Sequence, residues 1–295
     1  MMFPRQGLII CCHFGIIACA SFSYAEVYCR AGTSFGQSVQ YLVKENESLL
    51  EIARSFDVGY TEIVTANRDS DPFIPTRDSL ATIPSCWILP DLPGRDGIVI
   101  NTPEMRLYYF PKNSRKAALS FPVGIGGKGQ ETLLGSYRII EKTTNPSWHV
   151  PESIRLENPD LPKTVLPGPD NPLGRYALRL SPHNILIHGT NRPFSIGRQA
   201  THGCIRLYPE DIRKLFTMVR HGTNVTIISQ PVKVAEVDGS VYIEVHKDEG
   251  RDLLKEAKMR LRAMRLMEKI DGALLFKAIL EMKGIPVNIS RQAAL

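Results

Sequence analysis

Two histidines and one cysteine lie in the stretch from His188 to Leu207, HGTNRPFSIGRQATHGCIRL, which is otherwise rich in glycine, small polar residues and arginine. The thiolate of a cysteine is a strong nucleophile, but little of a free thiol is ionised at neutral pH, so a neighbouring imidazole is the usual activator. Cys204 follows His202 and Gly203 and precedes a predicted helix, where backbone N–H groups and the helix dipole favour the thiolate. The stretch therefore indicates nucleophilic catalysis by Cys204.

The two histidines are predicted to have different roles. His188 ends the apolar stretch NILI, a predicted strand that holds the ring rigidly, whereas His202 shares the loop of Cys204. A general base must reach the sulfur across space, so His188 is the predicted base. The backbone N–H groups of His202, Gly203 and Cys204 are predicted to form an oxyanion hole.

Other interpretations of these residues remain open. Cys204 could be a buried structural thiol, although Thr-His-Gly-Cys is an unusual composition for an apolar pocket. His188, His202 and Cys204 could bind zinc, because three protein ligands suffice for a catalytic zinc site. The spacing H-x13-H-x-C matches no common zinc arrangement, so no metal is predicted.

The N-terminal residues 1–25 have the layout of a secretory signal peptide. One arginine, Arg5, precedes an apolar run from Gly7 to Phe22, and a Ser-Tyr-Ala sequence ends at Ala25. The run is shorter than the roughly 20 residues that a membrane-spanning helix needs. Export to the periplasm is predicted, and a lipid anchor on Cys19, which follows a weak lipobox, is the alternative.

Charge and cysteine content narrow the function further. The chain has 36 basic and 30 acidic residues, and removing Arg5 with the leader leaves 35 against 30. A basic exported protein suggests an acidic, stationary partner such as a cell envelope. The sequence has no cluster of Lys and Arg with interleaved aromatic residues, so nucleic-acid binding is not predicted. Three cysteines follow residue 25, so a Cys29–Cys86 disulfide is plausible and leaves Cys204 as the unpaired thiol.

The remaining sequence divides into three parts after the leader. Residues 39–90 read as strand, helix, helix and strand, and the Pro- and Gly-rich stretch 87–97 is a predicted linker. Residues 96–231 have the period-two pattern of a mostly β domain, interrupted by one helix that starts near Pro209 and ends near Gly222. Residues 232–295 form a predicted hairpin and a helical extension, which either braces the β domain or docks a partner.

The C-terminal extension is predicted in more detail. The hairpin turns at Asp238-Gly239. An amphipathic helix is predicted over about 251–269 and a second helix over about 273–283. The apolar stripe of the first helix is Leu254, Ala257, Leu261 and Met264.

The sequences IHGTN and THGCIRL closely resemble the active-site signature of the YkuD-type L,D-transpeptidases. The stretches GIVINTPEMRLYYFPK, VGIGGKGQETLLG, PSW and LPGPDNPLGRYAL are similar to the ErfK/YbiS group of that family. The resemblance implies a β-sandwich or barrel with one helix after the cysteine. It also implies a small α+β module of LysM type before the catalytic domain and helices after it.

The resemblance further implies a reaction. Members of the family attack the carbonyl between the third residue and the terminal D-alanine of a peptidoglycan tetrapeptide stem. Cys204 is then the nucleophile that forms a thioester, His188 moves the proton, and His202 and Gly203 line the oxyanion site. The residues implied to hold the substrate, or to hold the loop that carries Cys204, are Arg206, Thr201, Gly189 and Trp148. For Arg206, a two-point grip on a carboxylate and a structural anchor are both open.

The partners follow from the same resemblance. An envelope-protein lysine, a diaminopimelate side chain or water could accept the thioester, and water would make the protein an L,D-carboxypeptidase. No cofactor is implied, because the peptide bond of the substrate supplies the energy. The rival hypotheses are a non-catalytic peptidoglycan-binding adaptor and a metal-dependent hydrolase.

Residues 39–90 resemble LysM modules, which bind glycans rich in N-acetylglucosamine. They depart from the usual pattern at Asn46-Glu47, where Gly-Asp is common, and at Arg77, where glycine is common. The alternative is a spacer of LysM shape that only packs on its neighbour.

Overall fold

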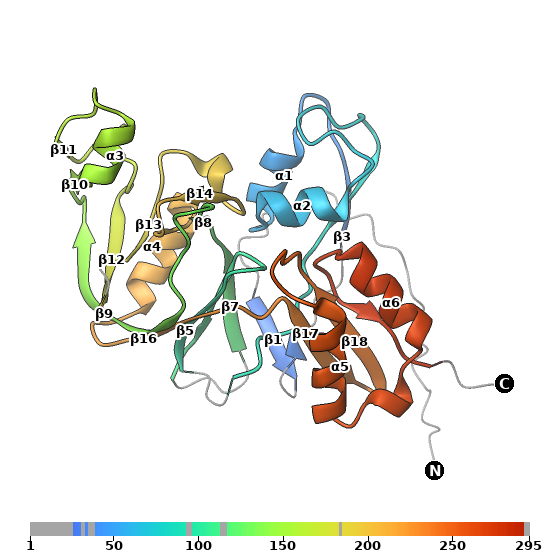
Figure 1. Cartoon of the computed structure of the whole chain (residues 1–295). Coiled ribbons are helices and arrows are strands. Elements are labelled where there is room, and N and C mark those ends of the chain that lie inside the picture. The colour runs from blue at the N-terminus through green and yellow to red at the C-terminus, as the bar shows by residue number, and fades with distance from the viewer. Residues whose placement is uncertain are drawn as a thin grey trace, which may run out of the picture.

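The computed structural model describes residues 26–30, 33–34, 39–92, 96–112, 117–182 and 185–291 (Figure 1). The predicted signal peptide, with its lipobox cysteine Cys19, lies outside these residues. The side chain of Cys29 is not described either, so the Cys29–Cys86 disulfide stays a prediction.

A ten-stranded sheet forms the centre of the molecule, in the order β15-β13-β12-β9-β16-β5-β6-β7-β1-β2. Most neighbours are antiparallel, but β13 pairs with β15 and β5 pairs with β16 in parallel. The strands are β1 (Glu26–Arg30), β2 (Thr33–Ser34), β5 (Gly97–Asn101), β6 (Arg106–Phe110), β7 (Ala117–Pro122), β9 (Gly135–Thr144), β12 (Tyr176–Ser181), β13 (Leu186–His188), β15 (Ile205–Arg206) and β16 (Asn224–Ile228).

Helix α4 (Pro209–Met218) packs on this sheet and follows Cys204, as predicted. Proline at the first helical position has the fixed φ that a helix needs, and its missing N–H has no helical partner in any case. The buried residues Ile212 and Leu215 join the sheet side chains in the largest hydrophobic core. The helix ends at Met218, and Gly222 lies in the turn that leads to β16, with a φ of +82°.

Residues 39–90 fold as predicted into strand, helix, helix and strand, which we call the N-terminal module. Its elements are β3 (Val39–Leu42), α1 (Leu49–Ser55), α2 (Tyr60–Ala66) and β4 (Leu80–Ile83), with β3 and β4 antiparallel. Ser48 caps α1 in a capping box with Glu51, which satisfies two backbone N–H groups that the helix leaves without partners. The module has its own hydrophobic cluster, which includes Leu49 and Ile52.

Residues 232–291 form a second α+β unit, which we call the C-terminal unit. It contains β17 (Val232–Val237), β18 (Ser240–Val245), β19 (Val287–Asn288), α5 (Leu253–Ala263), the 3-10 turn η2 (Met267–Lys269) and α6 (Gly272–Glu281). The hairpin turns at Asp238-Gly239 as predicted, with φ angles of 47° and 81° that suit a two-residue turn.

The helices of the C-terminal unit cover its three-stranded sheet and bury a separate core. The predicted stripe of α5 is partly wrong: Ala257 and Leu261 are buried, but Met264 is 45% exposed because the helix already ends at Ala263. Leu253, one residue before the predicted Leu254, completes the buried stripe. No helix of the described residues is both long enough and apolar enough to cross a bilayer.

A small lobe projects from the long strands β9 and β12, at the upper left of Figure 1, and was not predicted. This side lobe, residues 148–165, contains the paired strands β10 (Trp148–His149) and β11 (Thr164–Val165) and the helix α3 (Glu152–Glu157). Two further short strands, β8 (Ile125–Gly126) and β14 (Gln199–Thr201), pair in parallel beside the sheet, with the short turn η1 (Pro193–Ser195) before β14.

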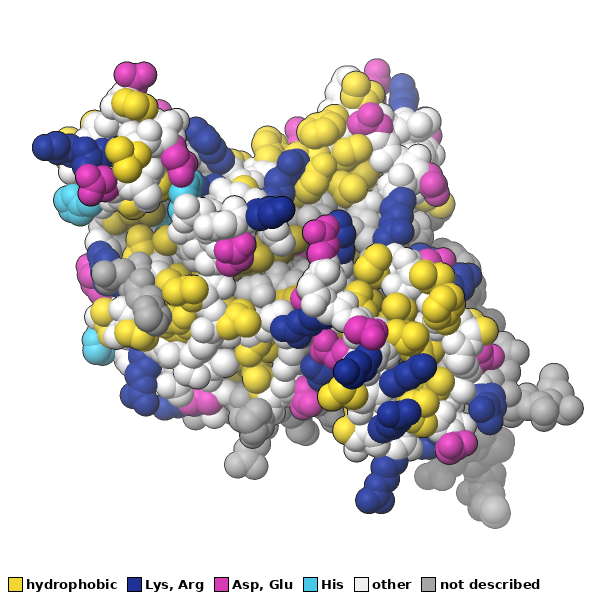
Figure 2. Space-filling model, viewed as in Figure 1, with side chains coloured by type: hydrophobic (Ala, Val, Ile, Leu, Met, Phe, Trp, Pro, Cys, Tyr) yellow, Lys and Arg dark blue, Asp and Glu magenta, His cyan; other side chains and the backbone are white. Residues whose placement is uncertain are grey.

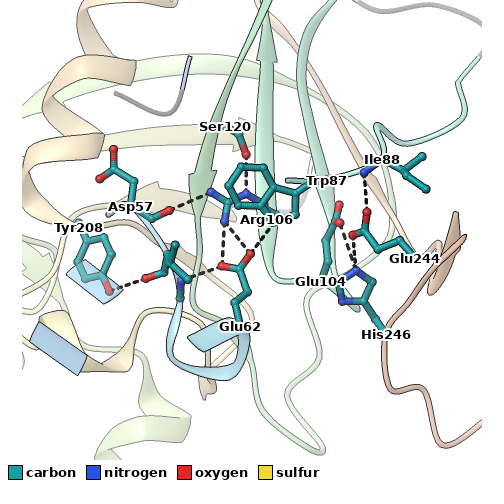
Figure 3. Close-up of polar contacts among 12 residues, drawn as sticks. Asp57, Glu62, Trp87, Ile88, Glu104, Arg106, Ser120, Tyr208, Glu244 and His246 are labelled. Atoms are coloured by element: carbon teal, nitrogen blue, oxygen red, sulfur yellow. Dashed lines mark hydrogen bonds and ion pairs between the residues drawn. The ribbon is translucent and has the colours of Figure 1, made fainter. Parts of the chain in front are cut away.

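The linker predicted at residues 87–97 is wrong in its first half. Trp87, Ile88 and Leu89 are each at most 3% exposed. The Trp87 ring N–H donates to Glu62 of the N-terminal module at 3.0 Å, and the Ile88 N–H donates to Glu244 of the C-terminal unit (Figure 3). Proline and glycine residues predicted an exposed linker here, but the apolar side chains of this stretch are buried instead. Burying each large apolar group stabilises the fold by about 1.5–3 kcal/mol.

A buried arginine connects the N-terminal module to the central domain (Figure 3). Arg106 of β6 is fully buried and binds both carboxylate oxygens of Glu62, at 2.7 and 2.8 Å. Its guanidinium stacks on Trp87 at 3.6 Å and donates to Ser120 and to the Asp57 carbonyl. A buried charge must be paired in this way, so the module is fixed to the central domain.

Two glycines meet at the same interface. A Cβ on Gly59, before α2, would lie 2.8 Å from the Gly197 Cα, and a Cβ on Gly197 would lie 2.3 Å from the Tyr60 nitrogen. Gly197 has a φ of +76°, and backbone hydrogen bonds join Tyr60 to Ile196 and Thr61 to Gly197. The backbone of the module therefore lies directly against the segment that leads to the candidate site.

Candidate active site

Cys204 and His188 lie at the ends of neighbouring parallel strands. β13 and β15 pair with Ile187 opposite Ile205 and with His188 opposite Arg206. Ile187 and Ile205 are fully buried in the core, and successive side chains of a strand point to opposite faces. His188 and Arg206 therefore lie on the other face of the sheet. Cys204 directly precedes β15, and the charge of Arg206 acts on both His188 and Cys204.

The backbone fixes the tautomer of His188. Its Nδ1 lies 2.6 Å from the carbonyl oxygen of Gly189, and the ring is only 3% exposed. A carbonyl oxygen can only accept, so Nδ1 carries the proton. In the neutral ring Nε2 then carries the lone pair, which is the form that a general base needs.

Burial keeps both members of the pair neutral. It lowers the pKa of His188 to about 4, together with the positive charge of Arg206. It also raises the pKa of Cys204, and this effect outweighs a backbone hydrogen bond from Leu186 and the charge of Arg206. The predicted stabilisation of the thiolate is therefore wrong for the free protein. One reason is that β15 and Tyr208 separate Cys204 from the start of α4.

Hydroxyl groups hold the loop around Cys204 in place. The Thr201 hydroxyl donates to the Cys204 carbonyl at 2.6 Å, and the Thr132 hydroxyl donates to the Gly203 carbonyl at 3.1 Å. Gly203 has a φ of +95°, which other residues rarely adopt. Thr201 is buried and acts on the loop, and these contacts set the direction of the peptide groups on either side of Cys204.

Arg206 uses part of its donor set on the protein. Its Nη1 donates to the Ala200 carbonyl at 3.2 Å, which closes the loop between β14 and β15. Its Nε is buried without a hydrogen-bond partner among the described residues. The anchor role is therefore present, and further donors of the guanidinium remain for a carboxylate.

The other predicted site residues lie around this pair. His202 is half-exposed, and its Nε2 lies 3.1 Å from a carboxylate oxygen of Glu157, at the end of α3 in the side lobe. Trp148 lies in the same lobe, in β10 opposite Val165. Gly189 packs closely, because a Cβ there would meet the Ile212 side chain at 3.1 Å.

Some contributors to the site were missed from the sequence. Thr132 and Glu157 are far from Cys204 in the chain, in the loop before β9 and in the side lobe. Arg179 lies opposite Leu186, and its charge lowers the pKa of Cys204. Only the sheet register, which periodicity does not give, could have indicated Arg179.

A separate cluster has the residue types of a metal site. Among the described residues, Glu104, Glu244 and His246 have ligand atoms within 4.8 Å of one another, and they are not the residues of the zinc alternative. The Lys233 ammonium lies 2.8 Å from Glu244 and contacts Glu104 as well. A buried ammonium already balances these carboxylates, so the cluster fits an ion-pair network better than a metal.

A buried imidazole and a thiol at the ends of neighbouring strands, in a mostly β domain, are suited to acyl transfer through a cysteine. The sequence matches the family model of the L,D-transpeptidase catalytic domain, YkuD, over residues 95–227. An NMR structure of the catalytic domain from the E. faecium L,D-transpeptidase aligns with 45% of this chain and 96% of that chain, at 20% identity and a TM-score of 0.36.

Curated relatives cover most of the chain. It is 36% identical over 279 residues to "Probable L,D-transpeptidase YcfS" of Escherichia coli strain K12, covering 88% of this chain and 87% of the relative. It is also 36% identical to "Probable L,D-transpeptidase ErfK/SrfK" of the same strain, covering 95% of this chain and 96% of the relative. The chain belongs to the YkuD-type L,D-transpeptidase family and is a peptidoglycan transpeptidase. The predicted fold class and enzyme class are confirmed.

Proposed function

We propose that Cys204 attacks the carbonyl between the third residue and the terminal D-alanine of a peptidoglycan tetrapeptide stem and passes the acyl group to an amine. The observation that supports this proposal is that His188 ends β13 while Cys204 directly precedes β15, the strand that pairs with β13 in parallel. The fixed His188 tautomer supports it, because Nε2 is the nitrogen left to accept a proton.

The reaction follows from these positions. His188 takes the thiol proton as the sulfur bonds to the carbonyl carbon, and the backbone N–H groups of His202, Gly203 and Cys204 stabilise the oxyanion. The protonated ring then gives its proton to the leaving amine, so D-alanine departs and a thioester remains. An acceptor amine attacks the thioester, loses a proton to His188, and the Cys204 sulfur leaves to recover the thiol.

Other residues hold the stem during these steps. Arg206 binds a stem carboxylate with the donors that it does not use on Ala200. Thr201 keeps the loop in shape, and Gly189 leaves room beside the base. Trp148 and the side lobe cover the donor, since the Glu157 contact holds that lobe beside His202.

The protein is proposed to act in the periplasm after removal of residues 1–25. The proposed acceptor is a lysine side chain of an envelope protein, as the likeness to the ErfK/YbiS group suggests. A diaminopimelate amine and water are the alternatives. The N-terminal module is proposed to be a LysM-like unit that contacts the glycan.

Purified muropeptides test the reaction. The parent protein should release D-alanine and show a thioester by intact-mass analysis, and Cys204→Ala should do neither. Equal retention of both proteins on sacculi without D-alanine release by either would favour the adaptor hypothesis. Activity that a chelator abolishes and that a thiol-directed carbapenem leaves intact would favour the metal-dependent hydrolase.

A competition experiment identifies the acceptor. The thioester form is offered a lysine-bearing peptide, a stem peptide with free diaminopimelate, or buffer alone, and the products are separated by mass. The proposal expects the lysine product in excess when all three compete. Dominant hydrolysis would instead identify an L,D-carboxypeptidase.

A further inference from the structure

A groove of about 950 Å³ lies where the N-terminal module, the central domain and the C-terminal unit meet. Cys204, His188 and Arg206 are not among its lining residues, and no part of the reaction above uses it. In Figure 2, both Lys or Arg and Asp or Glu side chains lie around the hollow in the middle of this face. The basic residues that line the groove are Arg68, Lys128, Arg198, Lys247 and Lys283.

The groove reaches the loop of the nucleophile. Thr132 lines the groove, and its hydroxyl donates to the carbonyl of Gly203, the residue before Cys204. Gly127 donates to the Thr201 carbonyl at 2.9 Å. The lining of the groove is therefore in direct contact with the loop that carries Cys204.

Most carboxylates of the groove pair with cations, and Glu131 is the exception among the described lining residues. Glu131 accepts from the Gly129 N–H at 2.8 Å. The other lining carboxylates pair with cations: Glu62 with Arg106, Glu104 with Lys233, Asp248 with Arg251 and Glu249 with Lys247.

Three lining cations, Arg68, Lys128 and Arg198, form no ion pair within 4.0 Å in the part of the chain that the structure describes. Arg68 donates to the backbone carbonyls of Glu281 and Met282. Lys128 is close enough to Glu131 and Glu249 to lower the pKa of both carboxyls, so its charge is partly balanced. The positive charge of Arg68 and Arg198, which no carboxylate of the described residues pairs, favours an anionic ligand.

Arg198 is the most rigidly placed of the three. Its guanidinium stacks on the Tyr60 ring at 3.4 Å, and its carbonyl accepts from the Ile125 N–H at 3.1 Å. Its Nε is buried and has no hydrogen-bond partner among the described residues. Buried donors are almost always satisfied, and a fixed guanidinium loses little freedom when it binds a carboxylate.

We propose that this groove binds a carboxylate-bearing stem peptide of peptidoglycan, with Arg198 as its central contact and Arg68 and Lys128 on either side. The proposal rests on the proposed function, because that function supplies peptidoglycan peptides as ligands. The shared chemistry is a peptide carboxylate, and it has two sources: the donor tetrapeptide, or an acceptor stem that approaches Cys204 from the groove.

Binding is measured on the Cys204→Ala protein, so that its result does not depend on catalysis. Calorimetry with a tetrapeptide muropeptide reports the donor, and a tripeptide muropeptide, which lacks the D-alanine to be released, reports the acceptor. Adding Arg198→Gln or Lys128→Gln should weaken binding of at least one ligand roughly tenfold, as expected for a hydrogen bond between charged groups. The matched control is Lys258→Gln, an exposed lysine on α5 that does not line the groove.

The experiment distinguishes a donor stem from an acceptor stem, and failure of the groove proposal from failure of the proposed function. Loss with the tetrapeptide alone assigns the groove to the donor, and loss with the tripeptide assigns it to the acceptor. Affinities within twofold of the control for both ligands overturn the proposal, even if the parent protein releases D-alanine. If the parent releases no D-alanine, the proposed function fails, whatever the groove binds.

Discussion

His188 and His202 differ in how the protein holds them, and this predicts different effects of mutation. His188 is buried with Nδ1 bonded to a carbonyl, whereas His202 is half-exposed and contacts Glu157. His188→Ala should lower kcat/KM for D-alanine release by at least about 100-fold, the range of a lost general base. His202→Ala keeps its backbone N–H and should cost less, about 10 to 100-fold.

Steady-state kinetics on one muropeptide check this order, with circular dichroism confirming that both variants fold. A larger loss in His202→Ala than in His188→Ala would reverse the assignment of the base.

The protonation of His188 predicts the acid side of the pH profile. Its pKa is lowered to about 4 by burial and by Arg206, so the ring stays neutral and able to accept a proton at pH 5 and above. The rate of Cys204 acylation should stay nearly level from pH 7 to pH 5 and fall below that, as the ring becomes protonated. Acylation by a carbapenem between pH 3 and pH 8 measures this. A drop centred near pH 6.5, the value of an ordinary histidine, would contradict it.

At the scale of residues, the sequence predicted the elements that carry His188 and Cys204 but not the ionisation of the two side chains. The strand-end position of His188 and the loop position of Cys204 were enough to place both on neighbouring elements. The burial of His188 could not be read from a loop of glycine and polar residues, because the groups around it come from distant segments such as Leu173.

Helix α4 carries a carboxyl group whose burial makes it sensitive to pH. Asp211 is fully buried, and burial and the nearby Asp57 raise its pKa well above the usual value. The unfolded chain ionises this group more readily, so the stability that it contributes is present at low pH and is lost as pH rises. Asp211→Asn changes the free energy of unfolding at each pH. This change should be more stabilising at pH 7.5 than at pH 4, by about 1 kcal/mol or more.

The neighbouring residue provides the control. Burial opposes ionisation of Glu210, but hydrogen bonds from Arg54 of the N-terminal module outweigh it and lower the pKa. Glu210→Gln should lower stability near pH 7.5. Thermal unfolding of both variants at the two pH values separates the effects, and an Asp211→Asn change that is equal at both would contradict the prediction.

At the scale of elements, periodicity and capping predicted most of what forms. Ser48 marked the start of α1, Pro209 the start of α4 and Asp238-Gly239 the hairpin. The side lobe was missed because its strands have two residues each and α3 buries no side chain. Such elements depend on their neighbours and leave no periodic pattern.

The three parts of the molecule are joined by buried charges, and one of these charges predicts the stability of the whole. Lys233 of the C-terminal unit is 2% exposed and pairs with Glu244 and with Glu104 of the central domain. Lys233→Met leaves two buried carboxylates without their cation and should lower the free energy of unfolding by about 3–5 kcal/mol. Urea denaturation of the full chain measures this.

Lys247→Met is the matched control, because that lysine is 72% exposed in a surface pair and its loss should be nearly neutral. If Lys233→Met does not fold, the double variant with Glu104→Gln removes one of the two charges and should recover part of the loss. An equal effect of Lys233→Met and Lys247→Met would mean that the buried cluster does not stabilise the fold.

At the scale of the whole molecule, the sequence predicted the parts but not their docking. Composition changes near residues 90 and 231 separate three units that each bury a hydrophobic cluster. The contacts between units join residues far apart, such as Glu62 with Arg106 and Glu104 with Lys233. No local pattern encodes such pairs, so a stretch like Trp87 to Leu89 reads as a linker until its neighbours are known.

The meeting of Gly59 and Gly197 limits how this protein can be rebuilt. A foreign module grafted in place of residues 39–90 could form the right ion pairs and still fail to pack against the central domain. Any side chain at position 59 or 197 would clash with the main chain opposite. Chimeras made between relatives should therefore exchange both glycine positions together, and a recombination library ought to show them surviving only as a pair.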